Sequence, residues 1–234
     1  MSSRGTGLTL SLGILAAIVG YILWQLAIGF NTKADEIQII LTNSSTNGTN
    51  FSIALILIAV GLTVHAAGLM STRGTAAGTA ESIGIYCIMT AILVWVVSTG
   101  LGFALIEMGG KFVAAAAGAL AVAAQTDARS IAVAAGFTQA ANVAANTIGS
   151  LLAGIGWISI GIAYRGSDAK GALSFIPLGW LALIAGLILV IANLVINQVA
   201  SIELASKISS ISFLLIVIWS VSRGLALIKA KNKK

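Results

Sequence analysis

Charged residues are scarce in this 234-residue chain, where they make up 9 % of the sequence, against roughly 25 % in soluble domains. Hydrophobic residues make up 58 %, and the mean hydropathy is +1.03. So few charges cannot cover a water-facing surface, whereas a lipid bilayer is itself the solvent for apolar side chains. The composition excludes an ordinary soluble domain and predicts one integral membrane domain over residues 1–234.

Cysteine, histidine and proline occur once each. Cys87 can form no internal disulfide. A haem needs an axial ligand, often a histidine, and a metal site usually takes several clustered ligands, which this sequence does not offer. The apolar runs also hold no carboxylate pair, no Ser/His/Asp pattern and no phosphate-binding glycine loop. We therefore predict no cofactor, no metal site and no enzymatic activity.

Long apolar runs predict membrane spans, since a helix needs about 20 residues to cross roughly 30 Å of hydrocarbon. Five stretches meet this length: 8–30, 51–70, 82–106, 172–196 and 208–228. A sixth, 141–164, begins with amide side chains and becomes strongly apolar from Ile148. The first run exceeds the 7–15 residues of a signal-peptide core, so we expect an uncleaved signal anchor. The prediction is an all-α bundle of six spans.

The distribution of basic residues predicts the orientation, because Lys and Arg gather in cytoplasmic loops. With six spans, the side of the two termini holds Arg4, Arg73, Arg165, Lys170, Arg223, Lys229, Lys231, Lys233 and Lys234, and the other side holds Lys33, Lys111, Arg129 and Lys207. We expect both termini in the cytoplasm and the chain in the cell membrane. The same distribution explains the net charge of +6 without a nucleic-acid partner.

The predicted outer loop 31–50 contains the run TNSSTNGTNFS at residues 42–52, which carries three N-glycosylation sequons, at Asn43, Asn47 and Asn50. They are candidate glycosylation sites on an outer loop. A loop rich in Ser, Thr and Asn also produces such sequons by chance, and both interpretations stay open.

Residues 109–138 are rich in alanine, which is an excellent helix former but gives little drive into lipid. If this segment crossed the membrane, the count would become seven and the basic tail would face outward, against the charge distribution. We therefore predict an extra Ala-rich helical hairpin on the outer side. A re-entrant pair of half-helices is the alternative.

Residues 157–186 place Tyr164 and Arg165 at the end of one span and the run Pro-Leu-Gly-Trp-Leu, from Pro177, at the start of the next. This segment resembles a broad family of uncharacterised six-span membrane proteins of bacteria and archaea. The resemblance implies the fold and topology over roughly residues 8–229, and it carries no chemistry. The chain departs from that pattern in a longer loop containing Asp168 and Lys170.

Ionisable groups inside the bilayer are the first candidates for function. His65 lies in the second span and Arg223 in the sixth, both about 9 Å inside the boundary at 1.5 Å per residue. They are either two separate anchoring groups, a hydrogen-bonded core histidine and a snorkelling arginine, or parts of a translocation path. Glu81 begins the third span, where the helix dipole favours a carboxylate.

Asn193 and Asn197 are four residues apart on the fifth span, near its predicted outer end. Together with Gln139, Asn142 and Asn146 they could line a polar opening, or they could form interhelical amide hydrogen bonds.

Two functional classes follow from these residues. The first is a non-catalytic structural or accessory subunit, held to itself or to other membrane subunits by small-residue helix faces such as Gly149, Ala153, Gly156 and Gly161. The alternative is a channel or transporter for a small solute or ion, with His65 or Arg223 in the path. We favour the first, with the lipid bilayer and a homo-oligomer or other membrane subunits as partners.

Overall fold

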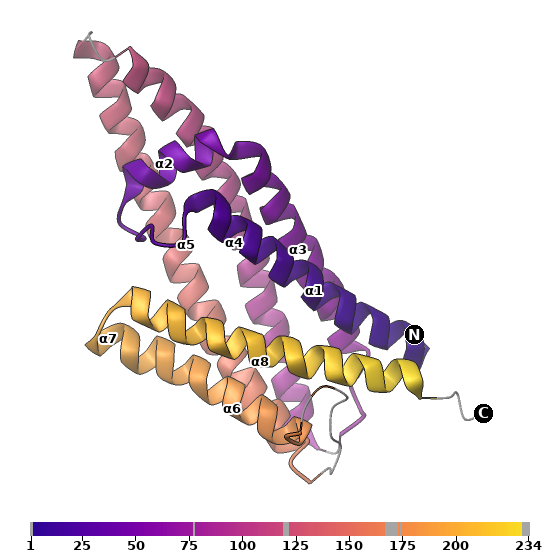
Figure 1. The fold of residues 1–234 in the computed structure, drawn as a ribbon. Coiled ribbons are helices and arrows are strands. Elements are labelled where there is room, and N and C mark those ends of the chain that lie inside the picture. Colours follow the sequence, from indigo (N-terminus) through magenta and orange to yellow (C-terminus); the bar gives the residue numbers. More distant parts are fainter. Residues whose placement is uncertain (1, 77, 119–121, 167–172, 174, 231–234) are drawn as a thin grey trace. The chain divides into compact units, whose positions relative to one another are not determined.

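A computed structural model describes residues 2–76, 78–118, 122–166, 173 and 175–230, and every regular element in them is a helix (Figure 1). Six of these helices are long and apolar enough to cross a membrane. The predicted all-α bundle with six candidate spans is confirmed.

The long helices are α1 Ser3–Ile28, α3 Gly48–Met70, α4 Thr79–Ala117, α5 Val122–Ala163, α6 Leu178–Ile191 and α8 Ile202–Lys229. A short helix, α2 Ile37–Thr46, precedes α3. After α6 the chain continues through a π-helical turn, η1 Ala192–Ile196, into α7 Asn197–Val199.

Local sequence explains several of these boundaries. Gly29 ends α1 with a φ of +100°, a left-handed conformation that suits a residue without a Cβ. Pro177 stands before the first turn of α6, where its missing N–H breaks no helical hydrogen bond. The hydroxyl of Ser201 caps α8 by accepting the backbone N–H of Leu204 at 3.1 Å.

The helices differ from the predicted spans mainly in length. The expected loop 31–50 contains helix α2 and the start of α3. The Ala-rich segment is helical, as predicted, but its described parts simply extend α4 and α5, which have 39 and 42 residues. At 1.5 Å per residue these two helices are about 58 and 63 Å long, twice the roughly 30 Å of hydrocarbon. Charged residues such as Lys111, Asp127 and Arg129 mark the part beyond it.

The chain divides into two compact units. Unit 1 comprises residues 1–17, 60–94 and 147–234, and unit 2 comprises residues 18–59 and 95–146. Within each unit, the described residues pack mainly against one another.

Glycine lets the helices of unit 1 approach to backbone contact. A Cβ on Gly68 of α3 would lie 2.5 Å from the nitrogen of Leu10 in α1, and one on Gly13 would overlap the backbone of His65. At the other face of α1, Gly7 packs in the same way against Gly224 of α8. Van der Waals packing of this kind replaces the hydrophobic effect between helices in lipid.

The same type of contact joins α4, α5 and α6. Gly84 faces Gly156, and a Cβ on Gly179 would lie 2.7 Å from the carbonyl of Tyr164. Helices α6 and α8 run side by side (Figure 1), and Ser212 donates to the carbonyl of Ala185 at 2.6 Å. These pairings place the starts of α1, α4 and α6 together with the ends of α3, α5 and α8. We call this part of unit 1 the termini end.

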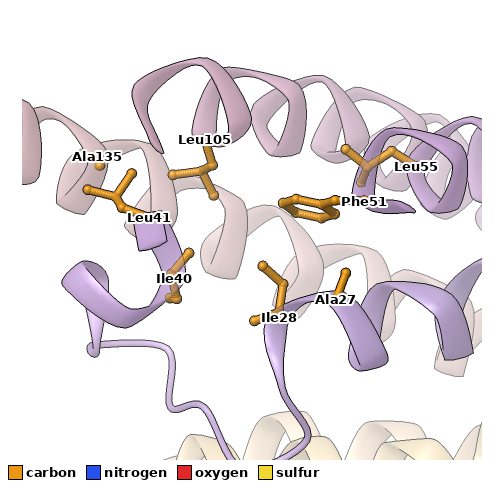
Figure 2. Close-up of a cluster of buried hydrophobic side chains, with 8 residues drawn as sticks. All are labelled: Ala27, Ile28, Ile40, Leu41, Phe51, Leu55, Leu105 and Ala135. Carbon is orange, nitrogen blue, oxygen red and sulfur yellow. The ribbon is translucent and has the colours of Figure 1, made fainter. Parts of the chain in front are cut away.

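Unit 2 is held by a cluster of larger apolar side chains, shown in Figure 2: Ala27, Ile28, Ile40, Leu41, Phe51, Leu55, Leu105 and Ala135. They come from α1, α2, α3, α4 and α5, so the short helix α2 is packed against four longer ones. Within the cluster, Leu41 is fully buried and Phe51 nearly so.

Candidate functional site

A buried carboxylate organises the termini end of unit 1. Glu81, in the first turn of α4, is 2 % exposed. Its oxygens accept hydrogen bonds from the backbone N–H of Gly74 at 2.6 Å and of Ala76 at 3.0 Å, and from the Thr75 hydroxyl at 3.1 Å. Gly74 has a φ of +85°, which allows this loop to fold around the carboxylate. Glu81 therefore fixes the loop between α3 and α4.

The Thr75 hydroxyl extends this network to α5. It lies 2.7 Å from the hydroxyl of Tyr164. Since its single hydrogen points to Glu81, the Tyr164 hydroxyl is the donor of this second bond. The Tyr164 ring meets Trp219 of α8 edge-on, with centroids 5.9 Å apart. Trp219 also meets Trp157 at 4.9 Å and donates to the carbonyl of Leu178 at 3.0 Å. One connected set of contacts thus links α4, α5, α6 and α8.

Arg223 of α8 lies on the other side of Tyr164. Its guanidinium carbon is 5.6 Å from the centroid of that ring, within cation–π range. The side chain is half-buried, and its Nε atom is buried without a hydrogen-bond partner in the part of the chain that the structure describes. No acidic side chain of that part forms an ion pair with it.

Two serine hydroxyls near Arg223 are also buried without a partner among the described residues, those of Ser11 in α1 and Ser220 in α8. Ser11 packs directly against Gly224, one helical turn from Ser220. Where α1 meets α8, polar atoms therefore outnumber the hydrogen bonds that the described chain provides.

His65 belongs to a different contact. The side chain is 2 % exposed, and its Nδ1 lies 3.0 Å from the carbonyl oxygen of Leu10. A carbonyl can only accept, so Nδ1 carries the proton. His65 therefore joins α3 to α1, whereas Arg223 of α8 contacts Tyr164, which directly follows α5. The two candidates have different neighbours, and among the contacts of the described residues none joins His65 to Arg223.

The amide candidates form two separate groups. Asn193, in the π-helical turn η1, donates to the Ser209 hydroxyl of α8 at 3.0 Å and to the carbonyl of Leu189 at 2.9 Å. No side-chain hydrogen bond is described for Asn197, a half-buried neighbour four residues on. These four residues belong to unit 1.

The second amide group lies in unit 2. Asn142 accepts a short hydrogen bond from the Ser98 hydroxyl. Asn146 donates to Ser98 at 3.2 Å, and Asn142 donates to Gln139 at 3.4 Å. The two bonds to Ser98 hold α5 to α4, so Asn142 and Asn146 act here as interhelical contacts, while the bond to Gln139 lies within α5.

Two of the three sequon asparagines cap a helix. The side-chain amide of Asn43 donates to the carbonyl of Ile28 at 2.7 Å, and that of Asn47 donates to the carbonyl of Ala27 at 2.9 Å. Both acceptors belong to the last turn of α1, whose carbonyls have no partner within their own helix. Asn50 is exposed. The nitrogen atoms that a glycan would occupy at Asn43 and Asn47 thus already bind the end of α1.

An open groove of about 440 Å³ lies in unit 2 beside the junction of α2 and α3. It is lined mainly by polar residues of that junction, together with Ile106 of α4: Ser45, Thr46, Asn47, Gly48, Thr49, Asn50 and Ser52. Among the described residues no group of three or more His, Cys, Asp or Glu side chains could hold a metal ion.

Sequence reasoning singled out Arg223 but missed the contacts around it. The Glu81 carboxylate was explained by the helix dipole, and Tyr164 was placed only at the end of a span. Their connection through Thr75 depends on a loop conformation. The only signal for it in the sequence is the glycine pair Gly74 and Gly78 flanking the loop.

No protein-family model matches the sequence, and comparison with curated proteins and with solved structures finds no similar chain. The resemblance stated for residues 157–186 therefore stays a prediction, and its loop residues Asp168 and Lys170 lie outside the described part.

Proposed function

We propose that the protein is a non-catalytic multi-pass membrane subunit, a structural scaffold that assembles with further copies or with other membrane proteins. One observation carries this proposal. The polar side chains inside the bundle are mostly used to hold helices together, as in the bonds of His65 to Leu10, Asn193 to Ser209 and Ser212 to Ala185. A reaction or a translocation path requires polar groups that remain accessible to a substrate.

The alternative of a channel or transporter placed His65 or Arg223 in the path. His65 is almost fully buried and bonded to a backbone carbonyl, and neither His65 nor Arg223 lines the described groove. These observations favour the scaffold over the channel.

The small residues named as an assembly face support a narrower version of the proposal. Gly156 and Gly161 pack against α4 and α6 of the same chain, and Ala153 is completely buried. Assembly would therefore use another surface. A Cβ on Gly100 of α4 would meet no heavy atom within 4 Å, and Val97, one turn earlier, is 69 % exposed.

The test is the mass of the assembly. The protein is extracted into nanodiscs with its native lipid, without delipidation, and studied by native mass spectrometry. We expect a mass that corresponds to several copies or to defined additional subunits. A single chain with no co-purifying protein would contradict the proposal.

A matched pair of variants locates the assembly surface. Gly100→Leu should reduce the assembled fraction without lowering the thermal stability of the single chain. Gly110→Leu is the control, because that glycine also has no neighbour within 4 Å but lies ten residues further along α4. Equal assembly of both variants would exclude this face of α4 as the contact.

We also propose that both termini lie in the cytoplasm, on the basis of the basic-residue distribution. A fluorescent reporter fused after the last residue should be active on the cytoplasmic side. In a Cys87→Ser background, Ser45→Cys should react with a membrane-impermeant maleimide from outside. Labelling of Ser45→Cys only after permeabilisation would reverse the orientation.

A further inference from the structure

Three arginines at the termini end of unit 1 each lie over an aromatic ring. The guanidinium carbon of Arg73 is 5.3 Å from the ring centroid of Tyr86, that of Arg165 is 5.4 Å from Trp180, and that of Arg223 is 5.6 Å from Tyr164. For a chain of 234 residues, three pairs match the usual frequency of about one per 70–80 residues, but here all three lie at the same end of unit 1.

None of the three arginines forms an ion pair with an acidic side chain of the described residues. Glu81, the acidic group described at this end, is buried, and its oxygens are occupied by the loop residues Gly74, Thr75 and Ala76. Arg4 and Lys229 add two exposed cations at the same end. The described part of the termini end therefore carries a clear excess of positive charge over available carboxylate.

A guanidinium that stacks on a ring keeps its N–H groups at the edge free. These groups form a planar fork that matches the oxygens of a phosphate in a bidentate way. Stacking also fixes the orientation of the fork, so less side-chain freedom is lost when an anion binds. Arg73 gives one of its N–H groups to the Tyr86 hydroxyl, at 3.1 Å. Among the described residues, no side-chain hydrogen bond is found for Arg165, and the Nε atom of Arg223 has no hydrogen-bond partner.

The aromatic partners show where the anion would lie. Trp180 is 43 % exposed and Tyr86 is 53 % exposed, and both belong to the first turns of apolar spanning helices. Tryptophan and tyrosine at span ends sit at the depth of the lipid headgroups. Tyr164 itself is 4 % exposed, but the exposed Arg165 directly follows it, so Arg165 and the exposed rings of Trp180 and Tyr86 lie at the depth where lipid phosphates are present.

We propose that the termini end of unit 1 is a binding surface for anionic phospholipids, whose phosphates are recognised by the ring-stacked guanidinium groups of Arg165 and Arg223, with Arg73 contributing. The surface selects phosphatidylglycerol over phosphatidylcholine, because the net negative charge of the former complements the uncompensated cations.

The experiment measures lipid retention in native mass spectra. Purified protein in neutral detergent is mixed with equal amounts of phosphatidylglycerol and phosphatidylcholine of the same chains. Wild type should keep phosphatidylglycerol preferentially. Arg165→Gln/Arg223→Gln should weaken its retention about tenfold, the loss expected when two charge-assisted contacts are removed. Equal retention of the two lipids by wild type would overturn the proposal.

Matched variants separate recognition from bulk charge. Arg4→Gln/Lys229→Gln removes the same charge from the same end, but neither residue has a described aromatic partner. This variant should therefore lose much less phosphatidylglycerol retention. Arg165→Lys/Arg223→Lys keeps the charge but removes the planar guanidinium fork. Its loss of phosphatidylglycerol retention should lie between those of the other two variants. If the Arg4/Lys229 variant lost as much as the glutamine double variant, or if the lysine variant equalled wild type, stacked arginines would not be the recognition element.

Two further measurements deal with a variant that fails to fold and with binding of a soluble anion. If Arg223→Gln fails to fold, Arg73→Gln/Arg165→Gln replaces it, since both side chains are exposed, and the same preferential loss is expected. Inorganic phosphate in large excess should not displace the bound lipid, because the acyl chains contribute to binding. Displacement by inorganic phosphate would show a soluble-anion site and overturn the lipid assignment.

Discussion

The two units of this chain are held together in different ways. Most of the glycines whose added Cβ would overlap a neighbour, among them Gly13, Gly68 and Gly156, belong to unit 1. There, buried polar groups such as Glu81 and His65 supply the hydrogen bonds. Unit 2 instead gathers larger side chains from five helices around Phe51 and uses asparagine amides to cap α1 (Figure 2).

The difference follows from the solvent. Between helices in lipid there is no hydrophobic driving force, so close backbone packing and hydrogen bonds hold them. Unit 2 contains helix α2 and charged residues of α4 and α5, including Lys111 and Asp127, which indicate water near its surface. Apolar side chains that leave water gain free energy, which adds to the packing of the cluster residues outside the predicted spans, Ile40, Leu41 and Ala135. The unit boundaries fall inside long helices such as α1 and α4, so a single helix is packed by two different mechanisms along its length.

The largest effect expected concerns the cluster of unit 2. Phe51→Ala should lower the free energy of unfolding by about 3–5 kcal/mol, because a 1 % exposed ring leaves a cavity. Phe137→Ala is the control, since that ring is 76 % exposed, and should change little. Unfolding in mixed micelles, followed by circular dichroism, measures both. Equal effects of the two variants would show that the cluster does not hold unit 2.

In unit 1 the corresponding test removes the buried carboxylate. Glu81→Ala leaves the backbone N–H groups of Gly74 and Ala76 without their acceptor, which should cost about 2–3 kcal/mol. The loop between α3 and α4 should also become sensitive to protease. Glu107→Ala removes an exposed carboxylate paired with Lys111 and should leave stability unchanged. A protease-resistant loop in Glu81→Ala would refute its anchoring by Glu81.

Glycine packing in unit 1 predicts opposite signs for one substitution. Gly13→Ala places a methyl group into the backbone of His65 and should destabilise the protein by about 1–3 kcal/mol. Gly100→Ala meets nothing within 4 Å in a helix and should stabilise it by up to about 1 kcal/mol. Thermal unfolding in identical micelles compares the two. Stabilisation by Gly13→Ala would mean that α1 and α3 do not touch there.

The smallest effect concerns the caps of α1. Asn47→Ala should cost about 1 kcal/mol by removing the bond to the carbonyl of Ala27, whereas Asn50→Ala, at an exposed position, should be neutral. Expression in a glycosylating cell adds a second measurement. If the caps form, the mass of the folded protein should show no glycan at Asn43 or Asn47. A glycan at either position would contradict the cap at that residue.

Much of the fold could be read from the chain. The six apolar runs and the Ala-rich hairpin are predicted by length and composition, since these decide what lipid accepts as a helix. The bounds of α4 and α5 were underestimated, because a span needs only about 20 residues while alanine continues a helix into water. Helix α2 was taken for a loop because its Thr-Asn-Ser-Ser-Thr run has low helix propensity, which packing of Ile40 and Leu41 overrides.

The candidate site could be predicted only in part. His65 and Arg223 stand out as the lone histidine and an arginine within an apolar run. Their partners do not stand out in the sequence. Leu10 contributes only a backbone carbonyl, which every residue has, and Tyr164 contributes a ring face, which every aromatic residue has. Likewise Asn43 and Asn47 read as glycan acceptors, since a sequon is a local pattern whereas a cap depends on where α1 ends in space.

The sequence alone determined that this is a six-span helical membrane protein with an excess of basic residues on one side, because partition into lipid depends on composition along the chain. Only the tertiary structure decided which polar groups are satisfied and which are left with unused hydrogen-bonding capacity. Glu81 is fully occupied by its loop, while Arg223 is stacked on Tyr164 without a carboxylate in the described chain. The physical reason is that hydrogen bonds and ring contacts act over a few ångströms, so they depend on which helices become neighbours.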